Sequence, residues 1–140
     1  MSVNIATVAQ NAAGNAIVDL IDIGTLNSFG YIEIRTGVKP ASPQTTTVGT
    51  TLLVRLSFSN PAFADFVNGK SSANVITPDE DGILATGVAS WFRIYDRNGA
   101  AIMDGDITPT GIGGDIEFDD INFVDGGTVS IDELLATMPQ

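Results

Sequence analysis

The 140-residue sequence contains no histidine and no cysteine. Without histidine it lacks the side chain that most often acts as a general base near neutral pH and that most often binds metals through nitrogen. Without cysteine it has no thiol nucleophile, no thiolate ligand and no disulfide. These two absences disfavour most classes of enzyme. We therefore expect no catalytic activity, no cofactor and no metal, and a role in binding or assembly.

Basic residues and long apolar runs are also scarce. Six Lys and Arg stand against 17 Asp and Glu, which gives a formal net charge of −11 at pH 7. Binding to a phosphate backbone needs clustered Lys and Arg, so we expect no direct contact with nucleic acid. No run approaches the ~20 apolar residues that cross a bilayer, and Met1–Asn15 lacks the pattern of a signal peptide. We expect neither a membrane segment nor classical export.

The composition that remains is that of a folded domain. The apolar share is 44%, well above that of disordered chains. A chain of about 150 residues buries roughly 68–70% of its unfolded surface, which is enough for one core. We expect a single domain over residues 1–140, with an N-terminal helix or arm over residues 1–24 and a β-sandwich body over residues 30–138.

The first residues have the period of an amphipathic helix. Apolar side chains recur three and four residues apart, at Ile5, Val8, Ala9, Ala12, Ala13, Ala16, Ile17, Leu20 and Ile21. This pattern predicts a helix from about Val3 to Asp22, capped by Ser2 or Asn4 and followed by Gly24 at a left-handed position. Gly14 costs about 1 kcal/mol relative to Ala. We therefore expect the helix to be held by packing against its own sheet or a neighbouring subunit.

After the helix the apolar period changes from 3.6 to 2. Tyr31–Arg35 and Leu52–Phe58 alternate apolar and polar residues, as strands with one buried face do. Between them, Thr36–Thr50 contains Pro40 and Pro43 and is too irregular for a sheet. Long loops without regular structure usually have a purpose. We expect this one to contact a partner, and a merely flexible surface loop is the alternative.

Later segments predict further short strands. Asn60–Phe66 predicts a Pro-initiated turn whose two phenylalanines enter the core, and Thr86–Asp96 is the strongest β segment. Asn98-Gly99 predicts a two-residue type I′ hairpin leading to an antiparallel strand over Ala100–Ile107. The other expected strands are Ala73–Thr77, Asp115–Phe118, Ile121–Val124 and Thr128–Leu135. Seven or eight short strands predict a mainly β fold, a β-sandwich that is jelly-roll-like.

The Thr86–Asp96 segment places aromatic residues on both of its faces. Trp91, Arg93 and Tyr95 share one face, and Trp, Tyr and Arg are the residues enriched at binding hot spots. We favour a core position for Trp91 and an interface position for Arg93 and Tyr95. The candidate partner interface consists of Trp91, Arg93 and Tyr95 with Pro40 and Pro43 of the loop and Ile17 and Ile21 of the helix.

The acidic residues raise two chemical hypotheses. A cluster of carboxylates in the second half of the chain could offer oxygen ligands to calcium, but the spacing of an EF-hand is absent and the acidic turn at residues 78–82 lacks further ligands. We expect solvated turn carboxylates and leave calcium open. Carboxylate pairs suited to glycoside hydrolysis occur by chance in any acidic chain. The serines have no histidine to activate them.

A family resemblance covers nearly the whole chain. It rests on the N-terminal Ala-rich helix and on segments in the order RTG (35–37), KPASP (39–43), GTTLL (49–53), NPAF (60–63), ANVIT (73–77), ATGVASWFR (85–93), DGD (104–106) and GGTVSI (126–131). In these segments the chain resembles small structural proteins of tailed bacteriophages and prophages.

The resemblance implies a virion component, above all a capsid cement or decoration protein that stabilises the shell. Its partner would be the major capsid protein, and it would sit on the outer capsid surface after synthesis in the host bacterial cytoplasm. The helix with Gly14 and the strand with aromatics on both faces further indicate a homo-oligomer, a dimer or trimer. Two alternatives stay open. One is a minor tail or fibre-associated protein, and the other is a carbohydrate-binding β-sandwich in which Trp91 and Tyr95 stack on sugar rings.

Overall fold

The structure, a computed structural model, describes residues 3–78 and 81–139. The predicted cap Ser2 and two residues of the acidic turn, Asp79 and Glu80, lie outside these ranges. Within them the elements are α1 (Thr7–Asp19), η1 (Leu20–Asp22), β1 (Tyr31–Thr36), β2 (Thr51–Ser57), β3 (Lys70–Ser72), β4 (Thr77–Pro78), β5 (Gly87–Val88), β6 (Trp91–Tyr95), β7 (Ala101–Pro109), β8 (Ile116–Phe118), β9 (Asn122–Phe123) and β10 (Leu135–Thr137).

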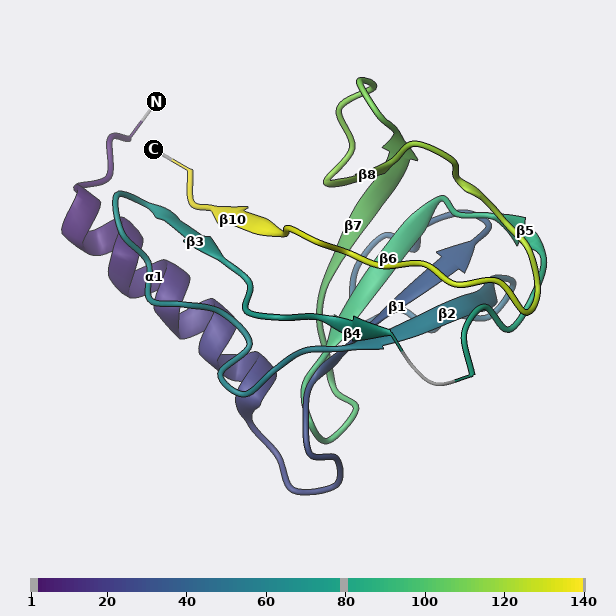
Figure 1. Ribbon diagram of the computed structural model, residues 1–140. Helices are drawn as coiled ribbons and strands as arrows, with labels where there is room; N and C mark the ends of the chain where they lie inside the picture. The colour runs from purple at the N-terminus through teal and green to yellow at the C-terminus, as the bar shows by residue number, and fades with distance from the viewer. Residues whose placement is uncertain (1–2, 79–80, 140) are drawn as a thin grey trace.

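Six of the strands form one curled sheet in the order β4-β2-β1-β6-β7-β8 (Figure 1). Neighbouring strands are antiparallel except β7 and β8, which are parallel. The pairs β3–β10 and β5–β9 form two small sheets. A mainly β chain with one N-terminal helix is therefore confirmed. A sandwich or jelly roll is not, because the core face of the large sheet is covered by short pairs and irregular chain.

The core lies on the inner face of the curled sheet. Ile32 and Ile34 of β1 pair with Leu56 and Val54 of β2, and on the other side with β6. All four side chains are fully buried. The expected phenylalanines of the 60–66 turn are buried against them. The alternation predicted for these two strands thus becomes the core, as one buried face requires.

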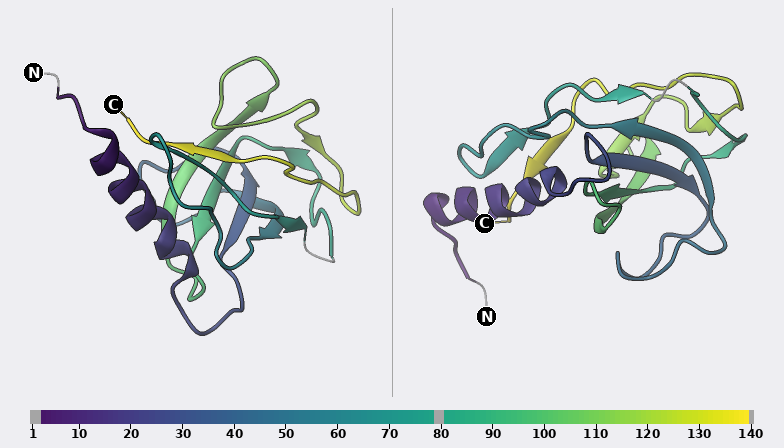
Figure 2. Two further views of the ribbon diagram at one scale, coloured as in Figure 1. Left: turned by 60° about the vertical axis from the view of Figure 1, so that its left-hand side comes forward. Right: turned by 90° about the horizontal axis from the view of Figure 1, so that it is seen from below.

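The helix begins later than predicted and ends where predicted. Ala6 is its extended N-cap and makes no side-chain cap, so Asn4 does not cap it. A 3₁₀ turn closes it at Asp22. Gly24 follows with φ +131°, and a Cβ there would lie 2.7 Å from the backbone nitrogen of Asn98. Only glycine suits both the conformation and the space. Two views show α1 beside β3 at one end of the sheet (Figure 2).

Three predicted strands differ from the observed ones. Thr86–Asp96 is split into β5 and β6, because Ala89 N–H donates to Ile121 and Ser90 N–H to Arg35. Ala73–Thr77 was wrong as a strand, since β3 and β4 lie on either side of most of it. Thr128–Leu135 was also wrong, because regular pairing begins only at its last residue.

The hairpin between β6 and β7 is confirmed, but its turn is not type I′. A type I′ turn needs positive φ at both central residues, and Gly99 has φ +80° while Asn98 does not share it. The Asp96 carboxylate accepts hydrogen bonds from the backbone N–H groups of Asn98 and Ala100, at 2.8 and 2.9 Å. A side-chain cap from Asp96 thus replaces the backbone geometry that the Asn-Gly pair predicted.

Candidate functional site

A row of charged side chains crosses the face of the sheet opposite the core. The strand register places Glu33 of β1 between Arg55 of β2 and Arg93 of β6, and Arg93 next to Asp104 of β7. We call these four residues the charged row. Their signs alternate across four strands, and directly opposed unlike charges stabilise a sheet.

Glu33 is held by two arginines. Its Oε2 lies 2.7 Å from Arg55 Nη2, and its Oε1 lies 3.0 Å from Arg35 Nη2. Burial alone would raise the pKa of this carboxyl, but the hydrogen bonds from Arg55 and Arg35 together outweigh it and leave the pKa below its usual value of 4.5. Glu33 is therefore an ionised group in a buried position.

Arg93 connects the charged row to the loop that covers it. Its guanidinium bonds Asp104 at 2.6 and 2.9 Å, and this pairing raises its pKa further above the ordinary arginine value. The same group donates to the carbonyl oxygens of Thr45 and Ser42 at 2.7 and 3.2 Å. Trp91 lies beside it, with the guanidinium carbon 5.3 Å from the ring centroid. Arg93 thus fastens the middle of the loop to strand β6.

Loop 37–50 is fastened at three further points. Lys39 Nζ lies 2.8 Å from Asp106 Oδ1, Ser90 Oγ donates to the Gly37 carbonyl at 2.6 Å, and Arg35 donates to Thr50 Oγ1 at 3.2 Å. The loop is irregular, as predicted, but its course is fixed from end to end. Two apolar side chains, Val38 and Val48, remain 87% and 89% exposed on it.

Five of the seven predicted interface residues lie on strand β6 and on the loop that Arg93 holds. Trp91 and Arg93 are 0% and 3% exposed. Tyr95 is half-buried and stacks on Tyr31 at a centroid distance of 4.9 Å. Pro40 and Pro43 are half-buried in loop 37–50. Trp91 and Arg93 are therefore too buried to contact a partner directly in this conformation.

The helix carries the other two predicted residues and presents its apolar stripe outward. Ile21 is fully buried in the core, whereas Ile17 is exposed. The buried helical residues are Gln10, Gly14 and Val18. The exposed apolar ones, together with Leu20 of η1, we call the outer helix face: Val8, Ala9, Ala12, Ala13, Ala16, Ile17 and Leu20. Thr7 and Asp19 of α1 are also exposed.

Polar side chains fix the helix in this orientation. Asn11, Asn15 and Asp22 accept hydrogen bonds from the backbone N–H groups of Gly69, Phe66 and Ala62, at 2.9, 2.8 and 3.0 Å. Burial raises the pKa of Asp22, although the bond from residue 62 opposes that shift. The period of the sequence located the helix, but these contacts with residues 62–69 left no signal in it.

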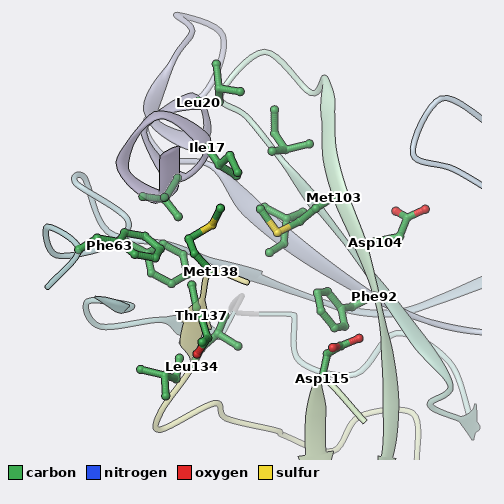
Figure 3. Close-up of a pocket in the computed structure, with 17 residues that line it drawn as sticks. Ile17, Leu20, Phe63, Phe92, Met103, Asp104, Asp115, Leu134, Thr137 and Met138 are labelled. Carbon is green, nitrogen blue, oxygen red and sulfur yellow. The ribbon is translucent and has the colours of Figure 1, made fainter. Parts of the chain in front are cut away.

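An apolar cleft opens where α1 diverges from the sheet. Its volume is about 620 Å³, and helix α1, strands β6 and β7 and the C-terminal segment line it (Figure 3). Ile17 and Leu20 belong to both the cleft wall and the outer helix face, so the two apolar surfaces are continuous. Asp104 and Asp115 lie at one end of the cleft. Sequence reasoning missed this cleft, because it is formed by segments far apart in the chain.

The acidic residues of the second half bond their own turns. Asp115 accepts from the N–H of residue 106 at 2.9 Å, Glu117 from Gly111 and Gly113 at 2.8 and 3.0 Å, and Asp120 from Asn122 at 2.9 Å. In the described ranges no three acidic side chains converge as metal ligands would.

Comparisons of the chain with models of protein families, with curated proteins and with solved structures find no match. The helical segments of residues 3–78 and 81–139 are too short or too polar to cross a bilayer.

Proposed function

We propose that this protein is a structural component of a bacteriophage virion, specifically a capsid cement or decoration protein. Its partner is the major capsid protein on the outer surface of the shell, and loop 37–50 is the surface that makes the contact. The observation that supports this most directly is the fastening of an irregular loop by the charged row and its neighbours, which leaves Val38 and Val48 exposed.

A fixed loop binds more tightly than a mobile one, because less conformational entropy is lost on association. Two exposed valines on such a loop offer apolar contact area, and Pro40 and Pro43 stiffen the chain between residues 38 and 48. Many copies on one lattice then add avidity to a modest single contact. The acidic remainder of the molecule, with its net charge of −11, keeps the outward side soluble.

The carbohydrate-binding alternative has weaker support. A sugar ring would have to stack on Trp91, which is fully buried, and Tyr95 already stacks on Tyr31. The minor tail alternative uses the same kind of protein contact. It differs from cement in the number of copies per particle.

Loop 37–50 is tested by substitution of its exposed valines. Capsid shells that lack this protein are mixed with the Val38→Asp, Val48→Asp double variant, and bound protein is measured after sedimentation. We expect at least a tenfold loss of affinity, because two apolar contacts become unpaired charges. The matched control is Val75→Asp, Val124→Asp, in which the valines are also exposed but lie far from the loop in sequence.

Full occupancy of the shell by the loop double variant would contradict the assignment of loop 37–50. Loss of binding by the control double variant as well would show an effect of charge alone.

A further inference from the structure

The outer helix face is apolar, and the one charged side chain of α1 is the exposed Asp19 at its C-terminal end. Residues 3–18 contain no Asp, Glu, Lys or Arg, and all 17 acidic residues lie from Asp19 onward. Val8 is 77% exposed, and Val3 and Ile5 extend the apolar surface before the helix. An exposed apolar patch of this kind marks an interaction surface.

The chain cannot hide this face by turning the helix. Rotation about the helix axis would break the hydrogen bonds that Asn11, Asn15 and Asp22 accept from residues 62–69. It would also displace Gly14, where a Cβ would lie only 2.5 Å from the ring of Phe66. These contacts therefore hold the apolar stripe toward the outside of the molecule. Only another molecule can cover it.

The charge distribution favours a second copy of the same chain as that molecule. Two copies with a net charge of −11 repel each other, and the repulsion is least where neither surface carries charge. A basic partner would find no acidic group on residues 3–18 to pair with. Helix α1, with Asp19 at its end as its one charged residue, is thus the part of this acidic molecule best suited to meet its own copy.

The area involved extends the contact beyond the helix. A 13-residue helix is about 20 Å long and about 10 Å wide, so one face of it offers about 200 Å². That area is well short of the ~800 Å² per partner of a stable interface. The mouth of the apolar cleft adjoins the helix through Ile17 and Leu20 and supplies further apolar area. The apolar contact surface is therefore larger than the helix alone.

We propose that α1 of a second copy packs against the outer helix face and the mouth of the cleft. Ala12 and Ala13 lie near the middle of α1 and allow the two helix axes to approach to about 8–10 Å. In a twofold arrangement each copy contributes the same residues, so Val8 of one copy approaches the Ile17 and Leu20 end of the other. This pairing is independent of the capsid contact, which uses loop 37–50.

The test measures self-association by sedimentation velocity and light scattering on the full chain. Val8→Glu and Val8→Lys place opposite charges at one exposed position, so a shared effect cannot come from net charge. We expect both to weaken the dimer at least tenfold, with an unchanged helical circular dichroism signal. The matched control is Val75→Lys, because Val75 is 75% exposed and lies away from the helix in sequence. Added salt should strengthen the wild-type dimer, since it screens the repulsion.

A wild-type protein that stays monomeric at about 100 µM in high salt would overturn the pairing. Equal association of the wild type and both Val8 variants would also overturn it, as would a mass above two copies. A Val8 variant that still binds shells, beside a Val38/Val48 variant that still dimerises, would show that the two surfaces act separately.

Discussion

Trp91 is the residue that separates a core role from an interface role on β6. It is fully buried, as favoured from the sequence, and Arg93 lies over its ring. Its indole N–H has no hydrogen-bond partner among the described residues. Its contribution to folding is therefore packing, and its polar atom is a cost.

We expect two substitutions of Trp91 to lower the free energy of unfolding by different amounts. Trp91→Ala should lower the free energy of unfolding by ~3–5 kcal/mol, because a large buried ring is lost. Trp91→Phe should cost much less, since it keeps an aromatic ring for Arg93 and removes the buried N–H that lacks a partner. Thermal melts of both variants check this. Equal losses of stability would show that packing of the full indole, rather than ring burial, is what matters.

Arg93 and Gly14 show why single residues are hard to interpret from sequence. Arg93 alternates with aromatics on a strand, a pattern typical of a wet interface rim, but the loop folds over it and leaves 3% of it exposed. Gly14 indicated packing against a sheet or a subunit, and the structure supplies Phe66 of the same chain. Both outcomes depend on segments about 50 residues away.

At the scale of elements, the charged row predicts how stability depends on pH. The pKa of Glu33 is lower in the folded protein than its ordinary value of 4.5. Its contribution is therefore fully present above about pH 4.5 and is lost as pH falls through the lowered pKa. Glu33→Gln should cost on the order of 2 kcal/mol at pH 7, less than for a fully buried pair because Arg55 is partly exposed.

The difference in unfolding free energy between wild type and Glu33→Gln should shrink as pH falls below 4.5, since protonated Glu33 resembles Gln. Denaturant titrations between pH 7 and pH 3 measure it. The matched control is Glu133→Gln at an exposed position, for which we expect little change at any pH. A pH-independent difference for Glu33→Gln would contradict the ionised state of the buried carboxyl.

The helix shows the limit of periodicity at this scale. The 3.6-residue period located α1 and its end correctly, but an apolar stripe is normally assigned to the core. Here Asn11 and Asn15 face inward, because they satisfy backbone donors of residues 62–69 that have no sheet partner at those positions. The sequence shows the two asparagines but not which backbone N–H groups they accept hydrogen bonds from.

At the scale of the whole molecule, local strand patterns were predictable and their pairing was not. The alternation in β1 and β2 and the hairpin between β6 and β7 are encoded within a few residues of each other. The parallel pair β7–β8 and the pairs β3–β10 and β5–β9 are not joined by tight turns. Their pairing depends on how the whole chain folds back on itself, which local patterns do not show. Sandwich topology was inferred from the number of strands, which does not determine how they assemble.

The two proposed contact surfaces lie on different parts of the molecule. The charged row fixes loop 37–50 on one face of the sheet, and the helix and most of the cleft lie toward the core, with Asp104 at the end of the cleft. A protein that joins capsid subunits needs both kinds of contact, one with the shell and one with its own copies. We expect substitutions in one surface to leave the other proposed contact intact.

The number of copies in purified particles tests the central claim most directly. Quantitative mass spectrometry of intact virions, with the major capsid protein as internal reference, gives this ratio. A capsid cement protein predicts on the order of hundreds of copies, in a fixed ratio to the capsid subunits, because it repeats with the lattice. A few copies that remain with isolated tails, or no copies in the particle at all, would contradict the account.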